Sequence, residues 1–113
     1  MRTVTTRPSF QGDLVIRRVD KMPKGLKCAA PENGFHILAH SETGHHHVVD
    51  ANLAQRFIDD TNTFTAFLEV TMSVALDHKR DFDTHEPLLL EPGIYEVRQQ
   101  REYVAEGFRR AAD

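Results

Sequence analysis

The clearest signal in this sequence is an apolar residue at every second position over 64–76, with mostly polar or small residues between them. In a helix the apolar members would be scattered around the whole circumference, whereas in a strand they share one face. The alternation therefore predicts a half-buried β-strand. Its buried face would carry Phe64, Leu68, Val70, Val74 and Leu76, and its exposed face Glu69 and Asp77.

The length of this alternation also predicts an interruption. A continuous strand over 64–76 would span about 43 Å at ~3.3 Å per residue, which is long for a compact domain. We therefore expect a bend or a break near Thr71, Met72 and Ser73.

Short apolar runs separated by turn signals fill the rest of the sequence. Residues 35–40 and 45–49 flank a glycine-containing connection and predict a hairpin. Strands are also predicted at 14–19, 88–90 and 94–98, with a weak one at 26–30. Residues 51–58 have apolar residues at helical spacing too, but the segment is short and flanked by strands, which favours a strand. Residues 99–113 fit a strand, a short helix or a tail.

Many short strands with a turn signal about every 8–12 residues are typical of an all-β domain, either a β-barrel or a β-sandwich of cupin-like or jelly-roll-like form. A chain of 113 residues, 40% apolar and 27% charged, has room for one such domain. We expect that domain at residues 10–104, preceded by a flexible N-terminal arm at 1–9 and followed by a C-terminal tail at 105–113.

Charge and composition restrict the partners of the chain. Its 14 basic and 17 acidic residues are mixed in order, which argues against nucleic-acid binding because that needs clustered Lys and Arg. No apolar run approaches the length of a membrane span, and the first residues lack the apolar core of a signal peptide, so we expect a cytoplasmic protein. The single cysteine, Cys28, excludes an internal disulfide, and we expect it to be buried.

Seven histidines in a chain of this length indicate a candidate site. His45 and His47 are two apart, so on a strand both imidazoles lie on one face, about 6.6 Å apart along the backbone, and can reach one ion. His46 must then face the other way. His36 and His40 are expected at the surface or in the hairpin.

His78 and His85 form the second histidine group. His78 continues the even-numbered apolar series and is therefore expected at the inner end of the buried row. His85 follows a loop that could return it to the same rim, and Asp77, Asp83 and Glu86 offer oxygen ligands or tautomer-fixing partners. The alternative is a hydrogen-bonded histidine cluster that closes a barrel end. The predicted site for a divalent ion such as Zn, Fe, Mn, Ni or Cu consists of His45, His47, His78 and His85.

Several elements resemble those of a family of small uncharacterised proteins from bacteria and phages, and together they cover most of the chain. They are Gln11-Gly12-Asp13, Thr43-Gly44-His45-His46-His47-Val48, the pair His78 and His85-Glu86-Pro87, Pro92-Gly93-Ile94-Tyr95-Glu96-Val97 and Gln100-Arg101-Glu102-Tyr103. In this sequence residues 79–84 lengthen the spacing between the last two histidines. The resemblance supports the site residues and implies no reaction.

A second resemblance is to the cupins, small β-barrels whose metal is held by histidines and a glutamate. His45-His46-His47 is similar to the histidine pair of the first cupin motif. No glutamate follows at the usual distance, Asp50 being the nearest carboxylate, and the second cupin motif is not present in the sequence.

Two functions are compatible with these patterns. The first is a metal-binding domain, with or without catalytic activity, in which Arg101, Glu102 and Tyr103 are candidates to bind a substrate of unknown identity. The second is a phage-derived structural or protein-interaction module, which would form a homo-oligomer through edge strands and could use the arm at 1–9 as a clasp. Metal analysis of the purified protein discriminates between the two.

Overall fold

The computed structural model describes residues 1–39, 46–78, 86–99, 101–104 and 107–110, with the backbone alone at Ala39, Thr63, His78 and the last two of these ranges. Every helix or strand among the described residues is a β-strand, which confirms the all-β prediction. The strands are β1 (Arg2–Thr3), β2 (Ser9–Gln11), β3 (Leu14–Val19), β4 (Lys27–Cys28), β5 (Phe35–Ala39), β6 (His47–Asp50), β7 (Ala54–Asp59), β8 (Asn62–Val70), β9 (Val74–His78), β10 (Leu88–Leu90), β11 (Gly93–Gln99), β12 (Arg101–Val104) and β13 (Gly107–Arg110).

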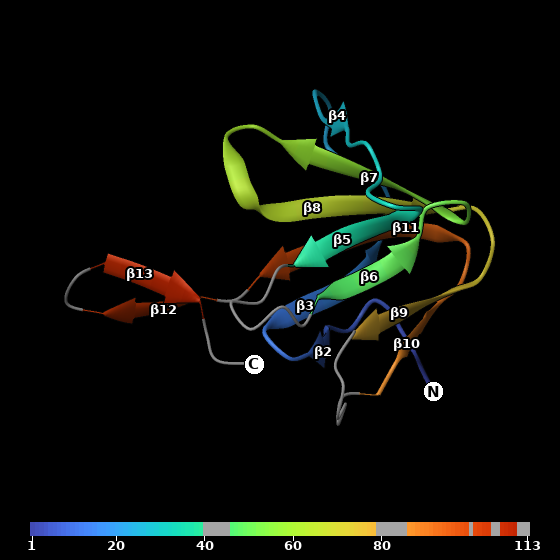
Figure 1. Ribbon diagram of the computed structural model, residues 1–113, viewed down its shortest axis with the longest axis horizontal. Coiled ribbons are helices and arrows are strands. Elements are labelled where there is room, and N and C mark those ends of the chain that lie inside the picture. Colours follow the sequence, from blue (N-terminus) through green and yellow to red (C-terminus); the bar gives the residue numbers. More distant parts are fainter. Residues whose placement is uncertain (40–45, 79–85, 100, 105–106, 111–113) are drawn as a thin grey trace.

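The strands form two large sheets and one separate hairpin, β12 with β13 (Figure 1). The five-stranded sheet has the order β1-β10-β9-β6-β5, and the six-stranded sheet has the order β2-β3-β11-β8-β7-β4. The strand pairs are antiparallel except β1 with β10, which is parallel. Each large sheet ends in two edge strands, so neither closes into a barrel within the described part of the chain.

Local patterns located several of these strands correctly. The predicted hairpin is confirmed by β5 and β6, whose ladder runs from Phe35↔Asp50 to Ala39↔His47. The strand favoured over a helix at 51–58 is confirmed as β7. The prediction that Cys28 is buried is wrong, because this residue lies on β4, a two-residue edge strand, and its side chain is exposed.

The interruption expected near residues 71–73 is confirmed, and it separates the two large sheets. β8 ends at Val70 in the six-stranded sheet, and β9 begins at Val74 in the five-stranded sheet. Thr71 stabilises the crossing, because its backbone N–H and its hydroxyl both donate hydrogen bonds to the Leu53 carbonyl, at 3.0 and 3.1 Å. The alternation of apolar residues thus continues through the break while the chain changes sheets.

Most of the burial predicted from the alternation is confirmed. Leu68, Val70, Val74 and Leu76 are buried, and Glu69 is exposed. The prediction for Phe64 is wrong, since 37% of its side chain is exposed. The register explains this, because Thr65↔Arg98 is the last pair between β8 and β11, so Phe64 lies beyond the end of that ladder. Asp77 is half-buried rather than exposed.

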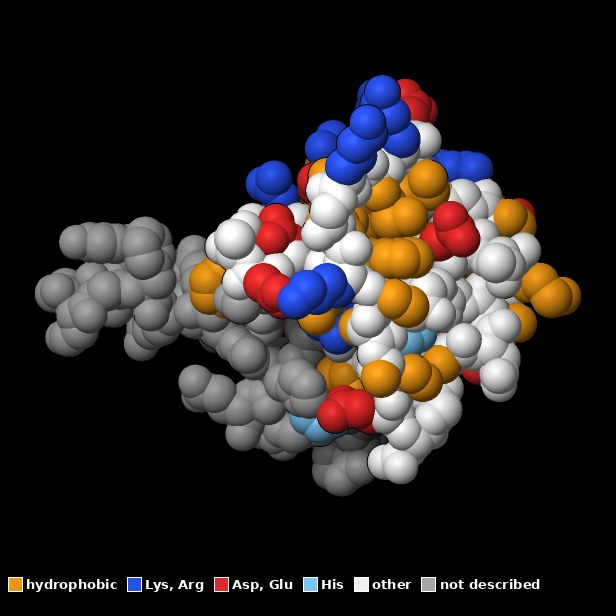
Figure 2. All heavy atoms as spheres, turned by 90° about the horizontal axis from the view of Figure 1, so that it is seen from above, with side chains coloured by type: hydrophobic (Ala, Val, Ile, Leu, Met, Phe, Trp, Pro, Cys, Tyr) orange, Lys and Arg blue, Asp and Glu red, His pale blue; other side chains and the backbone are white. Residues whose placement is uncertain are grey.

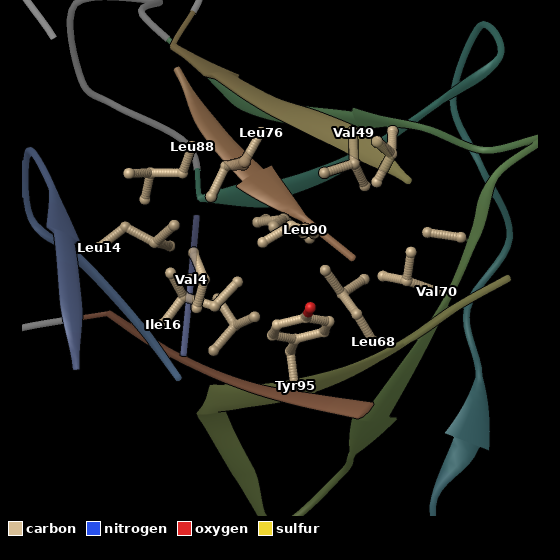
Figure 3. Close-up of a cluster of buried hydrophobic side chains, with 14 residues drawn as sticks. Val4, Leu14, Ile16, Val49, Leu68, Val70, Leu76, Leu88, Leu90 and Tyr95 are labelled. Carbon is tan, nitrogen blue, oxygen red and sulfur yellow. The ribbon is translucent and has the colours of Figure 1, made fainter. Parts of the chain in front are cut away.

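One hydrophobic cluster fills the space between the two large sheets (Figure 3). Leu76, Leu88 and Leu90 project into it from the five-stranded sheet, and Leu68 and Tyr95 from the six-stranded sheet. These five side chains are fully or almost fully buried. Burial of apolar area on this scale is the main stabilising contribution in a domain of this size.

The N-terminal residues 1–9, expected as a flexible arm, contribute to this core. β1 pairs with β10, and the Val4 amide donates a hydrogen bond of 2.9 Å to the Leu89 carbonyl. The Val4 side chain is only 2% exposed and belongs to the hydrophobic cluster. At the other end of the chain, the hairpin of β12 and β13 extends into residues 107–110, which were expected to be part of a tail.

The hydrogen bond of the Tyr95 hydroxyl makes a contribution to stability that can be measured separately from the packing of its ring. This hydroxyl donates a hydrogen bond of 2.6 Å to the Glu91 carbonyl, while the ring is fully buried. Replacing Tyr95 by phenylalanine keeps the ring packing and removes one donor, so we expect the free energy of unfolding to fall by about 0.5–1.5 kcal/mol. Urea denaturation of the two proteins measures the difference. A loss of the size seen when a whole side chain is deleted would contradict this account of Tyr95.

The surface carries both signs of charge. On the face shown in Figure 2, Lys and Arg side chains lie near Asp and Glu side chains, with hydrophobic side chains between them. The exposed large hydrophobic residues of the described part include Phe10 and Met72. Among the described residues, no helix has the length and the apolar character needed to cross a membrane.

Candidate functional site

His47 is the member of the predicted histidine site whose side chain the structure describes. It lies at the start of β6 and its side chain is fully buried, whereas that of the neighbouring His46 is only half-buried. In the register of β6 with β9, His47 is paired with His78, the two positions being directly opposite across the ladder. This pairing brings together the backbones of one residue from each predicted histidine group. His45, His85 and His40 lie outside the described residues.

Gln11 determines which nitrogen of His47 carries a proton. Its Nε2 donates hydrogen bonds to the carbonyl oxygens of Leu76, at 2.9 Å, and Glu86, at 3.2 Å. Backbone carbonyl oxygens only accept, so the orientation of the amide is fixed and Oε1 is the atom that lies 2.8 Å from His47 Nδ1. An amide oxygen cannot donate, so Nδ1 is protonated and donates to Gln11. In the neutral imidazole, Nε2 then carries the lone pair.

Asp13 lies at the other side of the same imidazole. Its Oδ1 is 3.6 Å from His47 Nε2, and its Oδ2 accepts a hydrogen bond of 3.3 Å from Gln99 Nε2. Both Asp13 and Gln11 are buried. The site therefore contains a carboxylate and an imidazole in a buried setting, where electrostatic interactions are stronger than in water.

A tight turn places these two side chains beside His47. Gln11 ends β2 and is paired with Leu14, the first residue of β3, so Gly12 and Asp13 form a two-residue connection. Gly12 has a φ of 59°, a conformation that glycine adopts without the steric penalty of other residues. The Gln11-Gly12-Asp13 element thus serves as a hairpin turn and supplies two polar side chains to one place.

Sequence reasoning about metal ligands missed both Gln11 and Asp13. The element that contains them was noticed only through the family resemblance, and no pattern within the sequence connects it to a histidine 36 positions away. Glu86, proposed as an oxygen ligand, takes part through its carbonyl, which accepts from Gln11. Among the residues that the structure describes, no three His, Cys, Asp or Glu side chains converge on one point.

His36 was expected at the surface or in the hairpin, and the structure places it in the hairpin, on β5, but not at the surface. Its side chain is only 2% exposed, because β5 turns this residue toward the other sheet, where its ring forms a hydrogen bond with the backbone of Ala54 on β7. Burial, and in second place the positive charge of Arg56, hold the pKa of His36 below its usual value of 6.5. His36 is therefore neutral near pH 7, and it lies on the strand next to that of His47, opposite Val49.

One family model matches the chain over residues 10–100, and its description is "Domain of unknown function (DUF8820)". The matched range contains His47 with Gln11 and Asp13, which lie beside its ring, and Gln99, which donates to Asp13. No curated protein and no solved structure matches the chain.

Proposed function

The chain belongs to this family of domains of unknown function, and we propose that the domain binds a divalent metal ion beside His47. The observation that carries the proposal is the separation of 3.6 Å between His47 Nε2 and Asp13 Oδ1. Gln11 fixes the proton on Nδ1, so in the neutral imidazole the two atoms that this distance joins, Nε2 and the carboxylate Oδ1, are both electron-pair donors. A cation between them offsets their repulsion.

The distance supports a shared ion over a shared proton. A direct N–H···O hydrogen bond is about 2.7–3.2 Å long, which is shorter than the separation observed. Two ligand atoms at ~2.0–2.2 Å from a tetrahedral zinc ion are about 3.4 Å apart, which is close to it. The bond from His47 Nδ1–H to Gln11 is also the arrangement typical of metal-ligating histidines, whose second nitrogen donates to a fixed partner.

The ligands that we propose come partly from the histidines predicted in the sequence and partly from residues that the structure places beside or opposite His47. His47 and Asp13 would bind from β6 and from the turn between β2 and β3, and His78 would join them as the residue opposite His47 in the ladder. His45 and His85, both outside the described residues, complete the set predicted from the sequence. A mixture of imidazole and carboxylate ligands suits Zn, Fe, Mn and Ni.

Metal content of untagged protein tests this function. After incubation with zinc, iron or manganese and removal of the excess, we expect stoichiometric metal in the wild type and none in His47→Ala or in the double variant His45→Ala/His47→Ala. His46→Ala is the matched control, since it removes the adjacent histidine that is predicted to face away, and it should retain the metal. A wild type without stoichiometric metal would refute the proposal, as would retention by His47→Ala.

The variant Asp13→Asn tests whether the Asp13 carboxylate binds the metal, with little change to the packing of the side chain. The substitution keeps the shape of the side chain and one of its two oxygens, and it removes the negative charge beside Nε2. We expect metal affinity to fall at least about tenfold, as for other changes close to a bound ion. Unchanged affinity would remove Asp13 from the ligand set while leaving the histidine site to be judged on His47→Ala.

A second candidate function is protein–protein interaction through a sheet edge. β5 is the longest of the four edge strands of the two large sheets within the described residues. Exposed edges of this kind can pair with a strand of another chain, including a second copy of the domain. Analytical ultracentrifugation tests the homo-oligomer, and a monomer at all concentrations would rule out pairing of β5 with a second copy of the domain.

A further inference from the structure

His36 reaches from one large sheet to the other. It lies on the edge strand β5, opposite Val49 of the core, and its ring bonds to the backbone of Ala54 on β7. Its Nδ1 is buried and has no hydrogen-bond partner among the described residues, so the bond to Ala54 comes from Nε2. A carbonyl only accepts, so Nε2 carries the proton of the neutral ring and Nδ1 carries the lone pair.

Arg56 provides a second buried polar atom in the same region. It lies two residues after Ala54 on β7, opposite the core residue Leu68, and its Nε–H is buried without a hydrogen-bond partner among the described residues. His36 is paired with Val49 and Arg56 with Leu68, and both of these partners belong to the core between the sheets, so the two residues lie on the faces of their sheets that are turned toward each other. Buried polar atoms without partners are rare in native proteins, and two together indicate that something polar is bound between them.

We propose that His36 and Arg56 form a binding site for a small oxyanion, a carboxylate or a tetrahedral anion, where β5 and β7 face each other. One oxygen would accept a hydrogen bond from Arg56 Nε–H. A second oxygen would accept from His36 Nδ1 after this atom takes a proton from solvent, so that anion binding is accompanied by the uptake of one proton. Neither His36 nor Arg56 is among the ligands proposed for the metal, so this proposal does not depend on the metal site.

The charges around the site are consistent with anion binding being coupled to protonation of His36. Arg56 is the positive group that acts on His36, and the exposed carboxylate of Glu32 acts in turn on Arg56. Without an anion, burial and the Arg56 charge hold the pKa of His36 below 6.5, so the ring is neutral near pH 7. A bound anion stabilises the protonated ring and raises this pKa. Above the pKa of the free site, the apparent dissociation constant should therefore increase about tenfold per pH unit.

Nuclear magnetic resonance of the imidazole nitrogens of His36 in the full chain tests the site. Acetate and sulfate are suitable probes because both keep a constant charge from about pH 5.5 to 8, and chloride at equal ionic strength is the control. We expect either oxyanion to raise the pKa of His36 beyond the effect of chloride, and the tighter of the two identifies the preferred class. A response no greater than that of chloride, or an affinity independent of pH, would overturn the proposal.

Two arginine variants test whether the oxyanion binds at Arg56. Arg56→Met should weaken oxyanion binding at least about tenfold, since it removes the charged donor. Arg98→Met is the matched control because Arg98 is an exposed arginine on β11 that contacts Glu96, and it should bind as the wild type does. Full binding by Arg56→Met would overturn the assignment. If this variant does not fold, the pH dependence in the wild type still decides.

Discussion

Replacing Leu68 by alanine is expected to lower the free energy of unfolding by about 2–5 kcal/mol. Leu68 is fully buried on β8 and is paired with Tyr95 on β11 and Arg56 on β7, so both neighbouring strands of the six-stranded sheet depend on its position. The substitution removes three carbon atoms from the core and leaves a cavity that the two surrounding ladders prevent from collapsing.

Chemical denaturation measures this loss, and Met72→Ala is its control. Met72 belongs to the same alternating series, but it lies in the break between β8 and β9 and 63% of its side chain is exposed. Its truncation should change the free energy of unfolding by no more than about 0.5 kcal/mol. Equal effects of the two substitutions would show that the alternation, and not the packing between the sheets, determines stability.

Replacing Gln11 by leucine is expected to cost about 2–4 kcal/mol, although leucine is apolar and of similar size. The amide satisfies His47 Nδ1–H on one side and the carbonyl groups of Leu76 and Glu86 on the other. Each buried polar group that loses its partner contributes a penalty of about 1–3 kcal/mol. The same change should weaken metal binding about 10- to 100-fold, because the orientation of the imidazole is no longer fixed.

Gln55→Leu provides the matched comparison for Gln11. Gln55 is half-buried, and its Nε2 donates longer hydrogen bonds, of 3.2 and 3.4 Å, to the carbonyls of Ala29 and Arg56, so water can replace what the substitution removes. We expect a loss below about 1 kcal/mol at this position. A long-range nitrogen spectrum adds a direct check, since His47 should be protonated at Nδ1 and His36 at Nε2. Protonation of His47 at Nε2 alone would contradict the arrangement inferred for Gln11.

The local structure of this domain follows largely from the order of its residues. Period-two alternation places alternate side chains on opposite faces of a strand, which is a property of the backbone and needs no knowledge of distant residues. For this reason the burial of Leu68 and Leu76 could be predicted. The hairpin of β5 and β6 was predicted from the glycine-containing connection between two apolar runs, and the interruption after Val70 from the length of the alternating segment. The same parity argument led to the prediction that His45 and His47 share one face of a strand, whereas the burial of His47 was not predicted.

What covers each face of a strand depends on how distant parts of the chain pack against it. Phe64 is exposed because the ladder between β8 and β11 ends before it. His36 is buried because the other large sheet covers it. The polar partners of His47 come from a turn 36 positions earlier in the chain, and the pairing of its backbone with that of His78 comes from the register of β6 with β9. Such contacts depend on how strands far apart in the sequence pair and how the two sheets pack, and a local sequence pattern does not specify either.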